Sequence, residues 1–504
     1  MLEEWGRGEW IKFGVSVVLG AQILAYVLKT WIFNGKSGKV PPGELGWPLW
    51  DETLNYLSSC ADSRSPGKWI DEKRALYGDV FKARLFGVPT VFALGSAGNR
   101  WVLSNDQVLF RQAWPKSMRT VFGQDSVLVA HGEKFRHLRL HIEQFLGTEA
   151  VKRFIGSMES CTLSRLERWQ QQQQDVKVYP ELHEHTFKVA LELIMGGAPE
   201  VNFHKMEQNC LVLGLNMFSV PINLPWTRFG KAMKAQGEIL KVFNSEIRRR
   251  RAEWYAGLSP LGKGGRLSSN NLDLARDLLD LFMFWETDKT NSQQKEWEFT
   301  DTEIAQNMLV VIEGAHGTTA ATLTNAMYYL STRPHIVQEL RKEVLSVAEA
   351  KKADEPLSWA EIRNMTYTRN VLLETLRMRT TVPQLNKETV QDLEFEGFTI
   401  PKGWVVTCCP RQTHNREENF PNPELFDPSR FNQSPDLYSF IPFGRGPRMC
   451  PGEKFGMTVM QVFLYHLVAK FDWELVDPEE QFTMFFAPTP KNGLPVKLTP
   501  RKLL

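Results

Sequence analysis

The sequence is poor in cysteine, and this shortage excludes two kinds of scaffold. Its 504 residues include six cysteines, scattered apart from one adjacent pair: Cys60, Cys161, Cys210, Cys408, Cys409 and Cys450. None of the spacings matches a disulfide framework or a zinc site. The cysteines therefore argue against a disulfide or zinc scaffold and fit a reducing compartment.

The sequence also lacks net charge and phosphate-binding motifs. Its Lys and Arg residues number 60 and its Asp and Glu residues 58, which leaves a formal charge of +2. No basic stripe with interleaved aromatic residues appears, so we expect no nucleic-acid partner. The chain also shows no glycine-rich phosphate cradle and no flavin motif. A hydrophobic content of 42% is that of an ordinary globular protein with an ample core.

One long apolar run is present, from Trp10 to Phe33. As a helix it would be about 36 Å long, against roughly 30 Å of bilayer hydrocarbon. The acidic stretch before it and the missing small-residue cleavage site are unlike a signal peptide, and positive charge after it favours a cytosolic carboxyl side. We therefore predict a lumenal segment 1–9, a transmembrane anchor 10–33, a proline-rich linker 34–48 and a cytosolic catalytic domain 49–504. A helix lying on the membrane surface is the alternative.

Beyond the linker the patterns are mainly helical, and we find neither an internal repeat nor a domain break. Val80 to Leu94 alternates around Phe86-Gly87, which predicts a hairpin of two short strands. Amphipathic runs from Glu149 to Trp169 and from Arg228 to Tyr255 predict long helices. The expected fold class is mainly α with small β-sheets.

A capping box formed by Thr300 and Glu303 opens a run to about Ser331 that is apolar over much of its circumference. Such a helix should lie buried through the centre of the domain. Midway it carries Glu-Gly-Ala-His-Gly-Thr-Thr at 313–319. Each glycine weakens a helix by roughly 1 kcal/mol relative to alanine, so we expect something to pass close to the backbone there.

A second capping box, Ser358 with Glu361, precedes a helix that contains Glu374 and Arg377. These two residues are three apart and therefore share a helical face. Alone, such a pair is usually a surface salt bridge that contributes little to stability.

Glycines crowd a single cysteine at 443–452, where the sequence reads Phe-Gly-Arg-Gly-Pro-Arg-Met-Cys-Pro-Gly. Glycine lets the backbone turn and approach a bulky group without a Cβ clash. Amides freed by the loop and by the helix expected at 453–470 favour a negatively charged sulfur and lower the pKa of Cys450. Arg448 adds a fixed positive charge suited to a carboxylate or phosphate. A buried structural cysteine beside a turn is the alternative interpretation.

This stretch resembles the haem-ligand loop of the cytochrome P450 family, whose pattern is Phe-x-x-Gly-x-Arg-x-Cys-x-Gly. The matching residues are Phe443, Gly446, Arg448, Cys450 and Gly452. The resemblance covers essentially the whole chain. It implies the P450 fold, in which haem b (iron protoporphyrin IX) lies between a long central helix and the cysteine loop, with the Cys450 thiolate as the axial iron ligand.

The resemblance extends to residues that would support the haem. It implies a buried ion triad of Glu374, Arg377 and Arg430, with a structural role. It also implies that Arg139 and Arg448 pair with the haem propionates. Phe135 stands where the family commonly has tryptophan, so the hydrogen bond that the tryptophan ring nitrogen would donate is absent. A surface charge is the alternative for Arg139.

The stretch 313–319 is similar to the family's oxygen-activating pattern, Ala/Gly-Gly-x-Asp/Glu-Thr-Thr. The matching residues are Gly314, Thr318 and Thr319. Ala315 replaces a glycine and Gly317 stands where the acid is expected. The resemblance implies that Thr318 assists oxygen activation and relays a proton. Our hypothesis is that Glu313, one turn before Gly317 on the same face, replaces the missing acid together with ordered water. The alternative is that Glu313 and His316 only satisfy local polar contacts.

The activity implied by the resemblance is a haem-thiolate monooxygenase that uses O2 and electrons from a membrane-bound NADPH-dependent flavoprotein reductase. Stretches at 41–48, 400–404 and 493–498 look most like the plant clan that oxidises sterols, triterpenoids and taxane-type diterpenoids. We expect a lipophilic polycyclic isoprenoid substrate, contact with membrane lipid, and residence in the endoplasmic reticulum membrane as a single-pass protein facing the cytosol. Lys134, Arg136 and Lys454 are candidates for the reductase-docking face.

Two other functions remain open at this stage. A haem-thiolate isomerase or dehydratase would work without a reductase, and the absent acid at Gly317 favours it, whereas Thr318 weighs against it. A haem sensor or carrier without turnover is the third possibility.

Overall fold

The computed structural model describes residues 39–46, 52–62, 65–172, 175–196, 202–268, 271, 274–285, 299–351, 355–484 and 487–501. The predicted lumenal segment 1–9 and anchor 10–33 lie outside these residues. Among the described helices, none combines the length and the apolar character that crossing a bilayer requires.

The chain forms two compact units, which the sequence patterns did not predict. The first contains the residues up to Arg111 together with Asn386–Cys409, and the second contains Gln112–Leu385 and Pro410–Leu504. The division between the units falls inside the predicted catalytic domain 49–504, and the described residues 39–46 of the predicted linker belong to the first unit. No composition shift marks the boundary, because strands far apart in the sequence complete the first unit.

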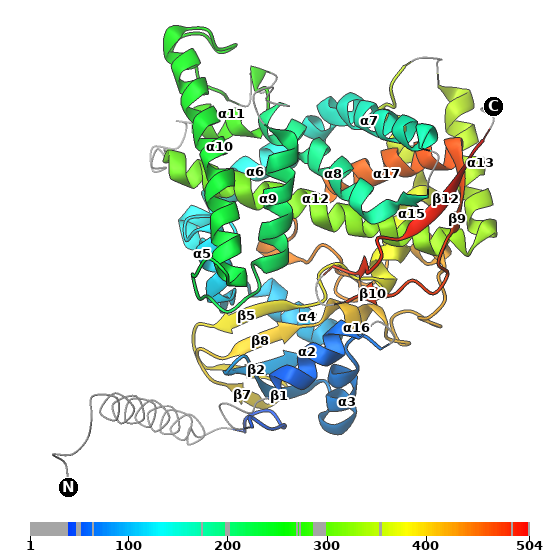
Figure 1. Ribbon diagram of the computed structural model, residues 1–504. Coiled ribbons are helices and arrows are strands. Elements are labelled where there is room, and N and C mark those ends of the chain that lie inside the picture. Colours follow the sequence, from blue (N-terminus) through cyan, green and yellow to red (C-terminus); the bar gives the residue numbers. More distant parts are fainter. Residues whose placement is uncertain are drawn as a thin grey trace, which may run out of the picture. The chain divides into compact units, whose positions relative to one another are not determined.

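The described residues of the first unit form β-sheets together with the helices α2, α3 and α4 (Figure 1). Its helices and strands are α2 (Thr53–Ala61), α3 (Lys68–Tyr77), β1 (Val80–Leu85), β2 (Val88–Ala93), α4 (Gly95–Ser104), β3 (Phe110–Gln112), β5 (Leu385–Thr389), β6 (Leu393–Phe395), β7 (Phe398–Ile400) and β8 (Val405–Cys408).

The larger sheet of this unit has the strand order β1-β2-β8-β5-β3, and β6 pairs with β7 separately. The predicted hairpin is confirmed, since β1 and β2 pair antiparallel with Val80 opposite Ala93. Phe86 (φ 52°) and Gly87 (φ 76°) both have positive φ, as the tight turn between the strands requires.

The second unit is mainly helical, which confirms the predicted fold class. Its elements are α5 (Lys116–Phe122), α6 (Gly132–Leu146), α7 (Thr148–Gln171), β4 (Val176–Lys177), α8 (Val178–Met195), α9 (Phe203–Asn216), α10 (Arg228–Ala256), α11 (Leu278–Phe284), α12 (Asp301–Ser331), α13 (Pro334–Ala350), α14 (Trp359–Asn364), α15 (Thr366–Met378), α16 (Pro410–His414), η2 (Pro428–Asn432), η3 (Gly446–Arg448), α17 (Glu453–Lys470), β9 (Phe471–Leu475), β10 (Phe482–Thr483), β11 (Thr489–Pro490) and β12 (Pro495–Pro500).

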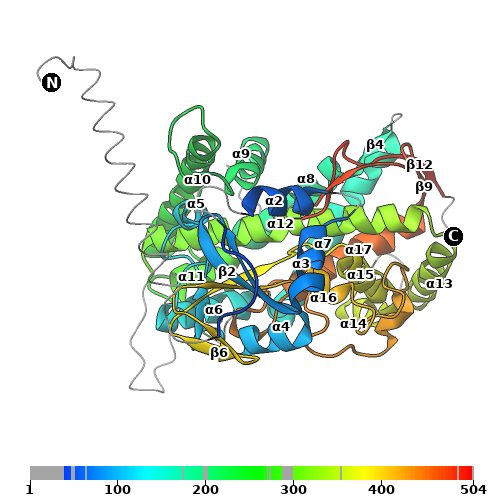
Figure 2. The same cartoon turned by 90° about the horizontal axis from the view of Figure 1, so that it is seen from below.

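The helix α12 runs through the middle of this unit, with α8 and α17 packed against it (Figures 1 and 2). Both predicted capping boxes are present: Thr300 and Glu303 cap α12 reciprocally, and Ser358 and Glu361 cap α14. The start of α12 therefore coincides with the predicted start, because the side chains satisfy the amides that the first turn leaves free.

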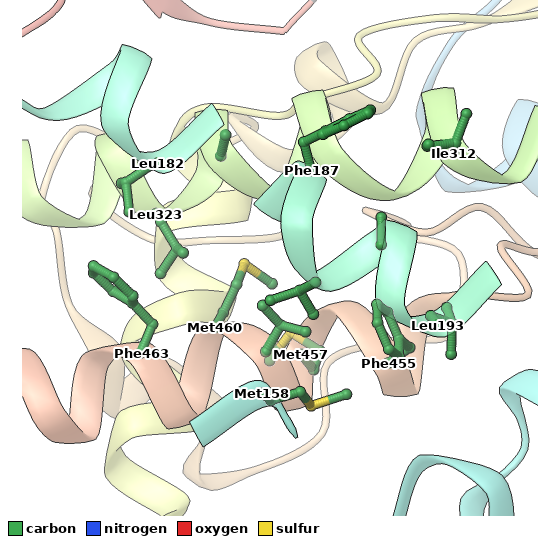
Figure 3. Close-up of a cluster of buried hydrophobic side chains, with 14 of the residues drawn as sticks. Met158, Leu182, Phe187, Leu193, Ile312, Leu323, Phe455, Met457, Met460 and Phe463 are labelled. Atoms are coloured by element: carbon green, nitrogen blue, oxygen red, sulfur yellow. The ribbon is translucent and has the colours of Figure 1, made fainter. Parts of the chain in front are cut away.

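Leucine, methionine and phenylalanine side chains fill the space around α12. Figure 3 shows part of this core, where side chains of α17 meet those of α7, α8 and α12. The labelled residues are Met158, Leu182, Phe187, Leu193, Ile312, Leu323, Phe455, Met457, Met460 and Phe463. Because their side chains are closely packed, α12 and α17 form a rigid support for the candidate site residues on α12 and in the loop before α17.

Candidate active site

The cysteine loop is a tight backbone structure that ends directly at α17. The Cys450 amide donates to the Phe443 carbonyl at 2.8 Å, which closes the loop on itself. Gly444 (φ 70°) and Gly446 (φ 75°) occupy the left-handed region, where a side chain would be strained. The half-buried ring of Phe443 packs against the main core and fixes the loop to the helical unit.

Protein atoms surround the Cys450 thiol, and this burial raises its pKa above the ordinary value. Backbone amides of Gly452 and Glu453 and the charge of Arg139 act in the opposite direction. The predicted amide donors are therefore present, but without a bound cation they do not outweigh burial. The Cys450 side chain is nevertheless solvent-accessible, which places an open space inside the surrounding protein. A metal cation bound there would favour the thiolate strongly.

The helix α12 is open to solvent at the point where its glycines occur. A Cβ added at Gly314 or Gly317 would meet no other atom within 4 Å, and Gly314 is exposed although the helix around it is largely buried. The Thr318 hydroxyl donates to the Gly314 carbonyl at 2.8 Å. One residue later, Thr319 lies against the first turn of α17, where a Cβ on Gly456 would be 3.8 Å from its Oγ1. The stretch of α12 that carries the glycines therefore adjoins the start of α17, which directly follows the cysteine loop.

The two predicted propionate partners lie beside this region, and each has a protein partner. Arg448 donates to the carbonyls of Val127 (3.0 Å) and Ala130, and its guanidinium stacks 4.0 Å from the centre of the Phe135 ring. The Arg139 Nε lies 2.6 Å from the Glu143 carboxylate, one helical turn further along α6. Phe135 thus contributes an aromatic face to the site, a contact that the comparison with tryptophan did not predict.

The structure brings Glu374, Arg377 and Arg430 together. Arg377 donates twice to the Glu374 carboxylate, at 2.7 and 2.8 Å, and both side chains are fully buried. The Arg430 Nε lies 3.4 Å from the same carboxylate. Arg377 also donates to the carbonyls of Pro423 (2.8 Å) and Leu425 (3.1 Å), so the triad ties α15 to the segment that precedes η2.

Glu313 lies on the open face of α12, one turn before Gly317, and its carboxyl group reaches α9. There it forms a hydrogen bond with the Cys210 thiol and lies 3.5 Å from where a Cβ on Gly214 would be. Burial raises the pKa of Glu313 to about 8, so the acid is protonated at neutral pH. Cys210 is a site residue that the sequence did not reveal, because α9 and α12 are far apart in the chain.

His316 has a structural place in the core. Its Nδ1 lies 2.5 Å from the Ile312 carbonyl, its ring meets those of His183 and Phe187, and burial lowers its pKa to about 3. A neutral imidazole whose Nδ1 bonds within its own helix is not placed to act on the open face. The structure therefore agrees with the alternative interpretation of His316, in which this residue only satisfies local contacts.

The residues present fit a large planar group held through sulfur. The Cys450 thiol faces an open space, amides point at the sulfur, and two arginines lie next to the loop. On the other side, the glycines of α12 leave room where side chains would otherwise fill the space. An iron porphyrin with two carboxylates matches this combination of a soft ligand, open space and basic side chains.

Comparison with known proteins agrees with this geometry. The chain is similar to a β-amyrin 28-monooxygenase of Solanum lycopersicum (34% identity, 93% of this chain and 95% of the relative) and to a taxane 10β-hydroxylase of Taxus cuspidata (33%, 97% and 95%). It is also similar to a protopanaxadiol 6-hydroxylase of Panax ginseng (32%, 93% and 95%). Among solved structures, the retinoic-acid-bound cyanobacterial CYP120A1 superposes with a TM-score of 0.79 at 28% identity, over 92% of this chain and 100% of that one.

The family model for cytochrome P450 matches residues 41–497, which span most of both units and include every residue of the candidate site. The match implies a haem-thiolate cofactor. The named relatives are monooxygenases and hydroxylases, and this chain aligns with nearly the full length of each. The chain therefore belongs to the cytochrome P450 family and is a haem-dependent monooxygenase.

Proposed function

We propose that the protein hydroxylates a polycyclic terpenoid, with O2 as oxidant and electrons from an NADPH-dependent flavoprotein reductase. The observation that carries the proposal is the accessible Cys450 in the loop directly before α17, together with the open stretch of α12 at Gly314 and Gly317, next to Thr319, which lies against the first turn of α17. The relatives named for triterpenoid and taxane oxidation support the substrate class. Apolar core residues border the site, as binding of a lipophilic skeleton requires.

The haem, bound through Cys450, supplies the activation of O2 for insertion of one oxygen atom into a C–H bond. The protein contributes the rest. Amides of Gly452 and Glu453 stabilise the charge on the sulfur, while Arg448 and Arg139 would hold the propionates by exchanging their present partners for carboxylates. The Thr318 hydroxyl, oriented by the Gly314 carbonyl, can pass a proton along α12.

The location and the electron donor follow the sequence predictions. We propose that residues 10–33 anchor the protein in the endoplasmic reticulum membrane with the catalytic domain in the cytosol. Of the three candidate docking residues, Arg136 and Lys454 are exposed. Lys134 is engaged in ion pairs with Asp125 (2.5 Å) and Glu303 (2.6 Å), so it is a weaker candidate for contact with a reductase.

Co-expression with a plant NADPH-dependent reductase tests the proposal. Cells are fed a panel of triterpene and taxane skeletons, and products are identified by mass spectrometry. We expect a product one oxygen atom heavier than its precursor, formed only with NADPH, reductase and O2. A product of unchanged oxidation level that forms without reductase would instead show the isomerase or dehydratase, which the missing acid at Gly317 favours.

We also propose that Glu313, with ordered water, supplies the proton that an acid at position 317 would otherwise deliver. Two features support this role: Glu313 lies one turn before Gly317, and its pKa of about 8 keeps it protonated at neutral pH. A positioned acid contributes about 10²–10⁴-fold to a proton transfer, so replacing Glu313 with alanine should lower product formed per NADPH at least ~10-fold. The lost electrons should appear as hydrogen peroxide, which a peroxidase assay measures.

The pH dependence gives this prediction a second readout. Wild-type coupling should decline as the pH rises through about 8, because the Glu313 carboxyl then loses the proton that it donates. The E313A variant should lack this step. Unchanged peroxide leakage in E313A would show that Glu313 has no part in proton delivery.

A further inference from the structure

The middle of α12 has an accessible stripe with helical spacing. Between residues 304 and 321 the helix is largely buried, yet successive turns on one side remain partly or fully accessible. The stripe consists of Gln306, Val310, Glu313, Gly314, Gly317 and Thr318, and Val311 and Ala315 form its edge. Residues 3, 4, 7 and 8 apart lie on one helical face, so this stripe is a continuous wall that ends beside the cysteine loop.

Two polar side chains interrupt this wall in the half that lies away from the cysteine. Gln306 and Glu313 are seven residues apart and therefore lie two turns apart on the same face, roughly 10 Å by the rise of an α-helix. In each, the Oε1 atom is buried and has no hydrogen-bond partner among the described residues. Both residues are partly accessible as a whole, and only the Oε1 atom of each is buried without a partner.

Each side chain has the backbone of a glycine as a close neighbour. A Cβ on Gly123 would lie 2.0 Å from the Gln306 Oε1, so the loop after α5 passes directly over that amide. The other carboxyl oxygen of Glu313 packs at Gly214 of α9, and Cys210 hydrogen-bonds to the carboxyl group. Glycine at both contact points leaves the polar side chains room that a larger residue would remove.

A buried oxygen without a partner is costly unless a ligand satisfies it. Leaving such a group unpaired typically costs about 1–3 kcal/mol, and native proteins contain few of them. Rotation about the last bond of a Gln or Glu side chain is soft, so either Oε1 can turn towards the accessible side at little cost. A hydrocarbon substrate would leave both groups unsatisfied, whereas one with oxygen substituents would not.

We propose that Gln306 and Glu313 hydrogen-bond to oxygen substituents of the substrate, so that the enzyme acts on a terpenoid that already carries a hydroxyl or carbonyl group. This inference rests on the proposed terpenoid hydroxylation and specifies its substrate. At neutral pH the Glu313 carboxylic acid can donate to a hydroxyl or carbonyl oxygen and also accept from a hydroxyl, as the Gln306 amide can.

The helix also fixes where these oxygens lie relative to the reacting carbon. Along α12, Glu313 precedes Thr318 by roughly 7 Å and Gln306 precedes it by roughly 18 Å, at 1.5 Å per residue. The oxygen substituents should therefore be remote from the carbon that is hydroxylated. The distance between them can be as long as a fused-ring skeleton. A reaction that installs oxygen on the skeleton must precede this one.

Spectral titration of the purified holoenzyme tests the inference without turnover. Ligand binding is followed by the haem spin-state difference spectrum, with matched pairs of a triterpene alcohol and its deoxy hydrocarbon, and of a hydroxylated taxane and its deoxy hydrocarbon. Because the buried oxygens gain partners only from the oxygenated member, wild-type protein should bind at least one such member about 10- to 100-fold more tightly than its hydrocarbon. If no oxygenated member is preferred, the inference is wrong.

Variants assign any preference to the two residues. E313L and Q306L should each reduce the preference to within about 3-fold, since an alkyl group cannot form the bond. E313Q should keep it, because an amide replaces a neutral acid with the same shape and hydrogen-bonding capacity, although it cannot serve as the acid proposed for coupling. E339L, at an exposed position of α13, is the control for an added leucine.

The outcomes separate this inference from the function on which it rests. If E313L and Q306L both keep the wild-type preference, recognition by these residues is wrong while terpenoid hydroxylation stands. If E313L lowers the midpoint of unfolding but keeps the preference, Glu313 has only a structural role through Cys210. If the reduced protein with carbon monoxide lacks the Soret band of a thiolate ligand, both proposals fail.

Discussion

Replacing Cys450 with alanine is expected to abolish monooxygenase activity and the Soret band of the thiolate-ligated carbon monoxide complex. The reason is that the Cys450 sulfur would be the group that holds the haem iron, and no other cysteine lies in the loop at 443–452. Haem could still enter the open space and contact the arginines, but it would lack the anionic ligand that favours O–O cleavage. Reduced difference spectra with carbon monoxide measure the ligand directly, and product formation measures the activity.

A second cysteine provides the control for this experiment. Cys161 lies buried on α7, and its replacement with alanine removes one sulfur atom from the core. Such a truncation is expected to cost roughly 1 kcal/mol of stability and to leave the Soret band unchanged. If C450A kept the thiolate band or oxidised substrate at the wild-type rate, the ligand assignment would be wrong.

The cysteine loop and the ion triad were predictable from the sequence because their residues are close in sequence or belong to a recognisable motif. Five fixed positions around Cys450 define the loop, and the spacing of Glu374 and Arg377 places both on one helical face. The capping box at Thr300 likewise fixes the start of α12 with side chains that are three residues apart. In these pairs the interacting groups lie within a few residues of one another, whereas Arg430, the distant third member of the triad, was predicted only through the family pattern.

The contacts of Arg448, Arg139 and Glu313 were not predictable in the same way. The carbonyls that Arg448 contacts belong to a loop more than 300 residues earlier, and the partner of Glu313 is on α9. Which partner a long side chain chooses depends on how helices pack, and no sequence period encodes this. The stripe on α12 had a signal, since polar Gln306 and Glu313 recur at helical spacing in an apolar helix. That signal becomes informative only when the structure shows which face is open.

Replacing Glu374 with alanine is expected to have the largest effect on stability. It would leave the Arg377 guanidinium buried without its carboxylate, since Arg377 is fully buried and directs two of its bonds to Glu374. Removing one partner of such a pair typically costs about 3–5 kcal/mol, because the remaining charge is uncompensated. Urea unfolding followed by tryptophan fluorescence measures the loss, and haem retained after gel filtration reports whether the cysteine loop is still held.

Two further variants distinguish a buried pair from an ordinary surface contact. R430A removes the third member, whose Nε is 3.4 Å from Glu374, and leaves the bidentate Arg377 contact and the Asp427 amide bond at 2.8 Å in place. It should therefore cost less than E374A. The double variant E374L/R377M removes both charges together, and since apolar pairs can replace buried ion pairs with little loss, it should be more stable than E374A alone. A cost below about 1 kcal/mol for E374A, the value typical of exposed pairs, would show that the triad does not hold the scaffold of the haem loop.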